Sequence, residues 1–233
     1  MTYTCQINQS SATLVEIHSV DEFLKYVLTA SSKGKYIYRG HASLSWQLKP
    51  SVGRRDDYSI ELENALFLQF KMKYWSYTNE RPTTDMDMLF LAQHYGLPTR
   101  LLDWSYNPLI ALYFACCSNN DEDGCVYMYP LDNAKFLDSD NNAKAPRTID
   151  QIFSLRSAYF VAPNYTDVRY RNQKALFLLS DKPSKEFYFA KKSFDIKAGA
   201  KKQILHELAL LGYDKTMLFP TLDSLCEDIK NNN

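Results

Sequence analysis

Hydrophobic residues follow two patterns along the chain. In some segments they recur every third or fourth residue, which predicts helices, and in others they form short runs, which predict strands. Leu62, Leu66 and Phe70 recur every fourth residue and predict a helix over Ser59–Tyr77, because this spacing places them on one helical face. Thr84 and Asp87 have the spacing of a capping box before the next helix. Further helices are predicted over 21–28, 85–95, 108–117, 200–211 and 221–229. The helix over 108–117 is apolar nearly all round, so other elements must wrap it.

Short apolar runs between these helices predict the strands of a sheet. Strands are expected at 35–38, 99–103, 125–129, 175–179 and 216–219, and a hairpin at 186–190 and 193–196. Residues 152–161 are compatible with a strand, and 131–147, rich in Asp and Asn, are expected to form a surface excursion. The pattern predicts one α+β domain over residues 1–233, with its core at about 21–228 and a central mixed or antiparallel sheet wrapped by helices.

Composition narrows the classes of partner. The 27 Lys and Arg residues equal the 27 Asp and Glu residues, so no overall field attracts nucleic acid or an anionic membrane. No apolar run approaches the roughly 20 residues of a membrane span, and the first residues lack the pattern of a signal peptide. The five cysteines form no CxxC pair, which argues against structural zinc and a disulfide framework. We therefore expect a cytoplasmic protein with no metal and no membrane partner.

Polar groups of different chemistry gather in the stretch 92–115, AQHYGLPTRLLDWSYNPLIALYFA. Gly96 and Pro98 end one helix, and Asn107 caps the next helix ahead of Pro108. Binding sites often lie at such strand-to-helix junctions, where side chains and free N–H groups point the same way. The candidate site residues in this stretch are His94, Tyr95, Thr99, Arg100, Asp103, Trp104 and Ser105.

Each of these polar residues also has a structural interpretation. Strand alternation would place Thr99 and Asp103 on one face and Arg100 on the other. Asp103 is expected to be partly buried and to pair with Arg39 or Arg100. Ser105 either contacts a ligand or caps the helix that follows, and His94 either serves as a general acid or phosphate contact or bonds locally.

Two further candidates lie outside this stretch. Arg39 ends a predicted strand beside Gly40, so its guanidinium suits a phosphate or carboxylate while glycine allows close approach. A salt bridge from Arg39 to Asp103 or Glu61 is the alternative. Arg169 and Gln173 are four residues apart and share a face whether the segment is helical or extended.

Together these residues resemble the FRG domain family, named for a Phe-Arg-Gly triplet. The resemblance rests on Tyr38-Arg39-Gly40, AQHYGLPTRLLDWS at 92–105, NPLIALYFA at 107–115, Arg169 with Gln173-x-Ala-x-Phe177, and LFP at 218–220, and it runs from about Asp21 to Asp228. Ala175 stands where the family often has Gly. Members are bacterial and phage-associated and occur in defence and toxin-like contexts.

The order of elements also resembles the plan of ADP-ribosyltransferases. Those enzymes carry Arg or His on a first strand, hydroxyls on a second strand before an apolar helix, and Glu on a later strand. Arg39 matches the first position, Thr99 and Ser105 flank the second, and Gln173 stands where the glutamate is expected. The resemblance implies an ADP-ribosyltransferase-like fold and NAD as substrate.

The leading hypothesis is therefore an enzyme that transfers or hydrolyses the ADP-ribosyl group of NAD or a related nucleotide. Arg39, His94, Ser105 and Gln173 would form its catalytic set, and Arg39, Gly40, Tyr95, Thr99, Arg100, Asp103, Trp104 and Arg169 its nucleotide-binding set. One alternative is a nuclease or nucleic-acid-modifying toxin that handles phosphate with His94, Arg39 and Arg100. Another is a non-catalytic module that senses a nucleotide or a protein. A protein or nucleic-acid acceptor and an antitoxin are the expected macromolecular partners.

Overall fold

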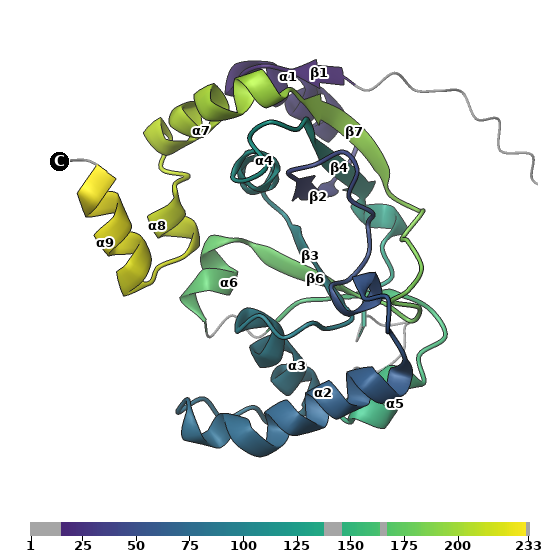
Figure 1. Cartoon of the computed structure of the whole chain (residues 1–233). Helices are drawn as coiled ribbons and strands as arrows, with labels where there is room; N and C mark the ends of the chain where they lie inside the picture. The colour runs from purple at the N-terminus through teal and green to yellow at the C-terminus, as the bar shows by residue number, and fades with distance from the viewer. Residues whose placement is uncertain (1–14, 138–145, 164–166, 232–233) are drawn as a thin grey trace, which may run out of the picture.

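In the described residues the fold is built on a seven-stranded mixed sheet. The computed structural model describes residues 15–137, 146–163 and 167–231 (Figure 1). The strands are β1 (Val15–Ile17), β2 (Tyr36–His41), β3 (Leu101–Ser105), β4 (Gly124–Pro130), β5 (Tyr159–Val161), β6 (Ala175–Leu179) and β7 (Lys191–Ile196). Their order in the sheet is β1-β7-β4-β2-β3-β6-β5, and every neighbouring pair is antiparallel except β1 with β7. The predicted α+β class and mixed sheet are confirmed.

The sheet opens between β2 and β3, and we call this place the joint. β2 pairs with β4 along its whole length from Tyr36 to His41, but it pairs with β3 at a single position, Tyr38 with Ser105. Beyond this position the two strands diverge. The sheet is thereby divided into a half formed by β1, β7, β4 and β2 and a half formed by β3, β6 and β5, which cross at an angle in Figure 1.

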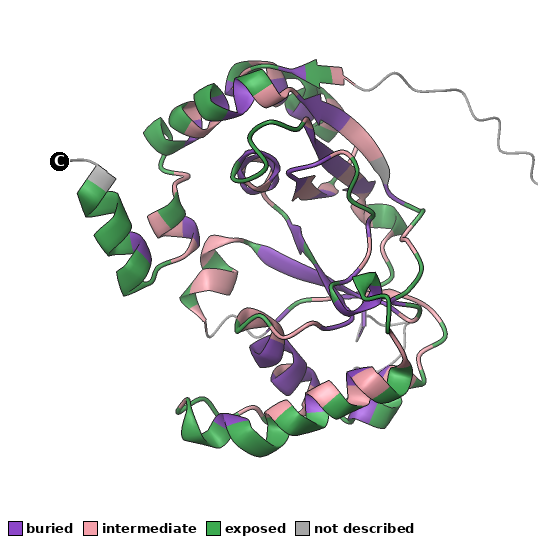
Figure 2. Ribbon diagram, viewed as in Figure 1, coloured by how far each residue is buried: buried purple, intermediate pink, exposed green. Residues whose placement is uncertain are grey.

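Helices cover each half separately. The first half packs against α1 (Val20–Ser31), α4 (Pro108–Cys116) and α7 (Lys201–Leu210). The second half packs against α2 (Ile60–Lys73), α3 (Asp85–His94) and α5 (Ile149–Phe153). A third cluster of buried side chains, including Leu102, Trp104 and Phe160, lies on the opposite face of the sheet. Figure 2 shows that α4 and the central strands are largely buried.

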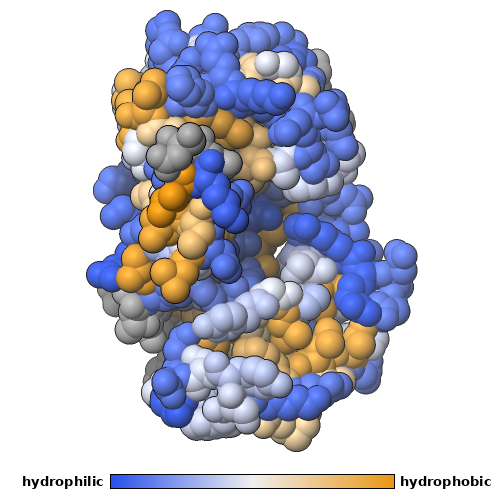
Figure 3. All heavy atoms as spheres, turned by 60° about the vertical axis from the view of Figure 1, so that its left-hand side comes forward, coloured by the Kyte–Doolittle hydropathy of each residue, from blue (hydrophilic) through white to orange (hydrophobic). Residues whose placement is uncertain are grey.

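The C-terminal part is more open. It contains α8 (Lys215–Leu218) and α9 (Leu222–Asn231), and α8 contacts α6 (Val168–Asn172). Leu222, Leu225 and Ile229 of α9 are exposed. Figure 3 brings forward the side of the molecule on which α9 lies. It shows apolar side chains on this side and a hollow between the upper and lower parts of the molecule. None of the helices in the described residues combines the length and the apolar character that crossing a bilayer requires.

Capping explains where several predicted helices begin. The side chain of Ser59 accepts from the backbone N–H of Leu62 at the start of α2. Thr84 and Asp87 form the expected capping box at α3. Asn107 accepts from the N–H of Leu109, with Pro108 at the first position of α4. Each cap satisfies a backbone donor that the helix itself leaves free.

Four expectations about local structure were wrong in whole or in their bounds. Residues 215–218 form α8 instead of a strand, because the Asp214 side chain caps the N–H of Met217 at 2.7 Å. Residues 149–153 form α5 because Thr148 and Gln151 make a capping box, so only the end of 152–161 is a strand. Residues 186–190 form no hairpin strand, and β7 pairs with β4 and β1 instead. The strand expected at 99–103 runs over 101–105. The expected surface excursion at 131–147 lies partly outside the described residues.

Candidate functional site

A pocket of about 250 Å³ lies where β2 and β3 separate. It is formed by residues of β2 and the loop after it, of β3, of α4 and the turn after it, of α6 and the residue after it, and of the start of β6. Its lining residues are Tyr38, Arg39, Gly40, His41, Trp46, Arg54, Asp103, Trp104, Ser105, Ile110, Ala111, Phe114, Cys117, Ser118, Arg169, Gln173 and Ala175. Three of the expected positions that are distant in sequence, Arg39, Ser105 and Gln173, therefore meet in one hollow.

Arg39 spans the opening between the two strands. Its Nη1 donates to the backbone carbonyl of Asp103 on β3 and lies 3.6 Å from an Oδ of the same residue. Its Nε donates to Nε2 of His41 at 2.9 Å. The guanidinium thus replaces the backbone ladder that β2 and β3 do not form. Burial lowers the pKa of Arg39 to about 10, and Asp103 opposes this shift, so the group stays cationic at neutral pH.

His41 is held neutral beside this charge. Burial, followed by the charge of Arg39, lowers the pKa of His41 to about 2. Because Nε2 accepts from Arg39, the ring proton of the neutral imidazole is assigned to Nδ1. His41 is thus an uncharged support for Arg39 across the physiological pH range.

Arg54 and Trp46 are pocket residues that the sequence analysis missed. Arg54 lies in a short helical turn, Val52–Arg54, and its Nε donates to the carbonyl of Lys49 at 2.9 Å. Burial lowers its pKa. Trp46 is 39% exposed and packs edge-on against His41. No periodicity marks this loop, and nothing in the sequence separates Arg54 from the neighbouring Arg55, which pairs with Asp57 outside the pocket.

Arg169 of α6 and Gln173, the residue that follows this helix, both line the pocket, so they share a face as their four-residue spacing predicts. The guanidinium of Arg169 stacks over Phe219 at 4.8 Å, and its Nη1 lies 3.4 Å from the carbonyl oxygen of His94. The Nε2 of Gln173 donates to the carbonyl of Leu218 at 3.0 Å. Both side chains are therefore held in place by the C-terminal part of the chain.

Ser105 joins the strand to the neighbouring elements. Its hydroxyl donates to the carbonyl of Gln173 at 2.7 Å and accepts from the N–H of Asn107 at 3.0 Å. This is the local capping role considered as an alternative. The hydroxyl proton is donated within the protein, to the carbonyl of Gln173.

Asp103 is more exposed than expected, with 65% of its side chain accessible. Its partners are Arg39 and the amide of Gln93, which donates to Oδ1 at 2.9 Å. Trp104, by contrast, is 3% exposed and packs against Phe160 on the opposite face of the sheet. It lines the inner wall of the pocket without offering an open ring face.

Gly40 serves the packing of α4. A Cβ at this position would lie 1.9 Å from the carbonyl oxygen of Ala111, so only glycine permits the helix to approach the strand this closely. The close approach predicted at Gly40 is thus made by backbone of the protein itself.

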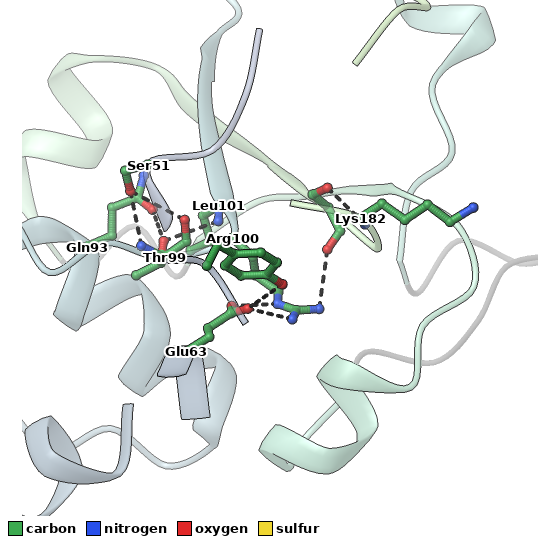
Figure 4. Close-up of polar contacts among 9 residues, drawn as sticks. Ser51, Glu63, Gln93, Thr99, Arg100, Leu101 and Lys182 are labelled. Carbon is green, nitrogen blue, oxygen red and sulfur yellow. Dashed lines mark hydrogen bonds and ion pairs between the residues drawn. The ribbon is translucent and has the colours of Figure 1, made fainter. Parts of the chain in front are cut away.

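Thr99 and Arg100 lie outside the pocket. Figure 4 shows the polar contacts that they make instead. Arg100 is 1% exposed, and its Nε and Nη2 donate to the two carboxylate oxygens of Glu63 at 2.7 Å each. The hydroxyl of Thr99 donates to Gln93 and accepts from the N–H of Leu101. Both residues are buried just before β3 begins, and their polar groups join the strand to α2 and α3.

His94 and Tyr95 also lie elsewhere. Nδ1 of His94 is 3.1 Å from Oδ2 of Asp167, and its side chain lines a separate hollow with Tyr170. Burial lowers the pKa of His94 against the opposing charge of Asp167. Tyr95 is 61% exposed and borders another surface hollow beside α2. The side chains of His94, Arg39 and Arg100 therefore do not share one site.

Charge distinguishes the pocket at the joint. Its lining carries Arg39, Arg54 and Arg169 against one carboxylate, Asp103, so three positive charges and one negative charge leave a net +2. Burial lowers the pKa of Arg39 and Arg54, and the charge of Asp103 opposes both shifts. Within the described residues, no cluster of His, Cys, Asp and Glu has the composition of a metal site.

Comparison with known proteins places an FRG domain at residues 34–124. This region contains β2, α2, α3, β3 and α4, and with them Arg39, Arg54 and Ser105. The resemblance inferred from the Tyr-Arg-Gly triplet and the 92–115 stretch is confirmed over these residues. Arg169 and Gln173 lie beyond the matched region. No curated protein and no solved structure matches the chain.

Proposed function

We propose that the pocket at the joint binds NAD or a related dinucleotide by its pyrophosphate, and that the chain transfers or hydrolyses the ADP-ribosyl group. The observation that carries this proposal is the meeting of three guanidinium groups with a single carboxylate in one hollow. A pyrophosphate diester has two negative charges, which match the net +2 of the lining. Guanidinium groups also suit phosphate oxygens because they donate in a planar fork.

The arginines keep donors available for such a ligand. Arg39 and Arg169 donate to the protein through Nη1, Arg39 also through Nε, and Arg54 through Nε alone. The remaining N–H groups of these side chains form no hydrogen bond with the described residues. Trp46, at the exposed edge of the pocket, supplies an aromatic ring on which a base or nicotinamide can stack.

In this reaction the bond between ribose C1′ and the nicotinamide nitrogen breaks, and its electron pair leaves with nicotinamide. Water or an acceptor group then bonds to C1′ and loses a proton. Gln173 lines the pocket and uses its Nε2 on Leu218, so its Oε1 would accept a hydrogen bond from a ribose hydroxyl. The roles of the chain would be to hold the pyrophosphate with Arg39, Arg54 and Arg169 and to orient the ribose with Gln173. A toxin or defence role in a bacterial cytoplasm, with an antitoxin as partner, fits this activity.

A non-catalytic nucleotide sensor is the second candidate. Two observations favour it: the Ser105 proton is already donated to a carbonyl, and Asp103, the pocket's carboxylate, is bound by Gln93 and Arg39. A nuclease is disfavoured because His94 does not share a hollow with Arg39 or Arg100.

Calorimetric titration with NAD, ADP-ribose and nicotinamide mononucleotide tests the binding. Arg54→Gln should weaken NAD binding by about 10- to 100-fold, as expected when a charged hydrogen bond is removed. Arg55→Gln is the matched control, because it removes the same charge one residue away and outside the pocket. Equal affinity of the two variants for NAD, or no binding of any ligand to the unmodified chain, would overturn the proposal.

Chromatographic assay of nicotinamide separates enzyme from sensor. Release of nicotinamide from NAD, either alone or with cell extract as the source of acceptor, supports the hydrolase or the transferase. Binding of NAD that depends on Arg54, with no release under either condition, assigns the sensor instead.

A further inference from the structure

A second hollow lies on the opposite face of the sheet, and the proposed function does not use it. Its volume is about 500 Å³, twice that of the pocket at the joint. Its walls come from the end of β4 and the residues after it, from β5 and the residues before it, from β6 and the loop that leads to β7, and from Pro50. We call it the aromatic hollow, after the residues of its floor.

Four aromatic side chains form that floor and one edge. Tyr129, Phe160 and Phe187 pack against one another, with ring centroids 5.6 to 6.3 Å apart. Phe189 continues this series, with its centroid 5.5 Å from that of Phe187, yet it is 79% exposed. A phenylalanine that keeps one face in water beside an aromatic floor offers a stacking surface for a planar ligand.

Cationic side chains surround the aromatic rings. Lys135, Arg156, Lys182 and Lys185 all line the hollow and are exposed. Within the described part of the chain, none of the four forms an ion pair, whereas lysines such as Lys71 and Lys197 elsewhere on the surface are paired.

The acidic residues of the hollow do not cancel this charge. They are Asp181 and Glu186, so the lining has four positive and two negative charges. Glu186 is also occupied, because its Oε1 accepts from the backbone N–H of Leu48 at 3.3 Å. A ligand that fits must therefore be both planar and anionic.

We propose that the aromatic hollow binds one nucleotide unit, with the base stacked on Phe187 and Phe189 and the phosphate held by Lys182 and Lys185. Aromatic platforms with cationic rims are how proteins bind single strands without reading their sequence. The same chemistry is present in a free mononucleotide and in one residue of a single-stranded RNA. The balanced net charge of the chain does not oppose such a site, because the cations are concentrated locally.

The test is fluorescence anisotropy with a labelled eight-residue oligoadenylate RNA, together with calorimetry with AMP. Phe189→Ala should weaken binding by about 5- to 100-fold, the range expected when one stacking partner is removed. Tyr188→Ala is the matched control, since Tyr188 is the adjacent residue, 75% exposed, and does not line the hollow. The expected result is that only the first variant binds more weakly.

Salt dependence tests the phosphate interaction. The double change Lys182→Gln and Lys185→Gln should lower the slope of log affinity against log salt by about 0.7, because the one phosphate that both lysines hold is no longer neutralised. Lys33→Gln with Lys202→Gln removes the same charge from exposed positions outside the hollow and should leave the slope unchanged.

The outcomes distinguish the ligand sources. AMP binding with the affinity of the RNA indicates a free nucleotide, and much tighter RNA binding indicates a strand; both support the site if Phe189 is required. Absence of binding, or binding that Phe189→Ala and Tyr188→Ala affect equally, overturns it. Arg54→Gln should leave this binding unchanged, so failure here is separate from failure of the pocket at the joint.

Discussion

Arg39 and Arg100 show how similar residues acquire different roles. Arg39 lies in β2 and Arg100 lies just before β3, and both were expected to bind a nucleotide. Arg100 meets the two oxygens of Glu63 in a buried pair, and its guanidinium also lies over Phe153. Arg39 donates to the backbone carbonyl of Asp103 and to the neutral imidazole of His41. Its ion pair with the Asp103 carboxylate is longer, at 3.6 Å. The difference arises from α2, because this helix places the carboxylate of Glu63 beside Arg100 and places no carboxylate beside Arg39.

The buried pair predicts a large cost for removing one partner. Glu63→Gln should lower the free energy of unfolding by about 3–5 kcal/mol, because Arg100 would keep a buried charge without its counter-ion. Glu61→Gln, on the same helix but exposed, should cost less than about 1 kcal/mol. Urea denaturation of both variants measures the difference. Equal midpoints would contradict the assigned role of the pair.

His41 predicts a pH dependence of stability. Its pKa is about 2 in the folded chain and about 6.5 when unfolded, so between these values the unfolded state binds the extra proton. Stability from this group is present above pH 6.5 and falls as the pH drops. From pH 7 to pH 5 the native chain should lose about 2 kcal/mol more than the variant His41→Gln. Denaturation at both pH values checks this, and parallel losses would show that His41 is protonated in the fold.

At the scale of elements, the position of α4 against β2 shapes the pocket. The helix begins where Asn107 and Pro108 place it, and it contacts the strand through Gly40. Because α4 supplies Ile110, Ala111 and Phe114 to the lining, its distance from β2 sets the width of the hollow.

Gly40→Ala tests this packing. The added methyl group would overlap the carbonyl of Ala111, so α4 must shift, at a cost of about 1–3 kcal/mol or more. Gly199→Ala is the control, because nothing lies within 4 Å of its Cβ and its φ is not positive. Calorimetric melting should show a lower Tm only for Gly40→Ala, with weaker NAD binding if the pocket binds NAD. Equal Tm values would rule out the close packing.

At the scale of the whole molecule, single side chains join distant segments. Lys201 begins α7 and is fully buried, and its Nζ donates to the carbonyls of Ala42, Ser118 and Asn119 at 2.7 to 3.1 Å. The ammonium thus joins the end of β2, the turn after α4 and the start of α7. Burial lowers its pKa, while three acceptors satisfy its three donors.

Lys201→Met should therefore destabilise the fold by at least about 3 kcal/mol, since three carbonyls would be left without their donor. Lys202→Met changes the exposed neighbour and should shift the free energy of unfolding by less than about 0.5 kcal/mol. Guanidinium denaturation compares them. A native-like midpoint for Lys201→Met would show that the three segments are held together without this residue.

Local signals were sufficient to predict most elements. Caps and four-residue spacing located α2, α3, α4, α7 and α9, and apolar runs located β2, β4 and β6. They failed at α5 and α8, where a side-chain cap outweighs an apolar or β-branched pattern. They also failed to separate Arg54 from Arg55, which differ only in what surrounds them after folding.

The order of elements, the caps and the gathering of polar residues at 92–115 are local properties, so the chain's residues determine them without reference to distant contacts. Which arginines remain available is not local. It depends on Glu63 reaching Arg100 from α2, and on β2 and β3 meeting only at Tyr38 and Ser105. The tertiary structure alone decides this, because a guanidinium binds whichever acceptor folding brings within hydrogen-bond distance, and that partner can lie anywhere in the chain.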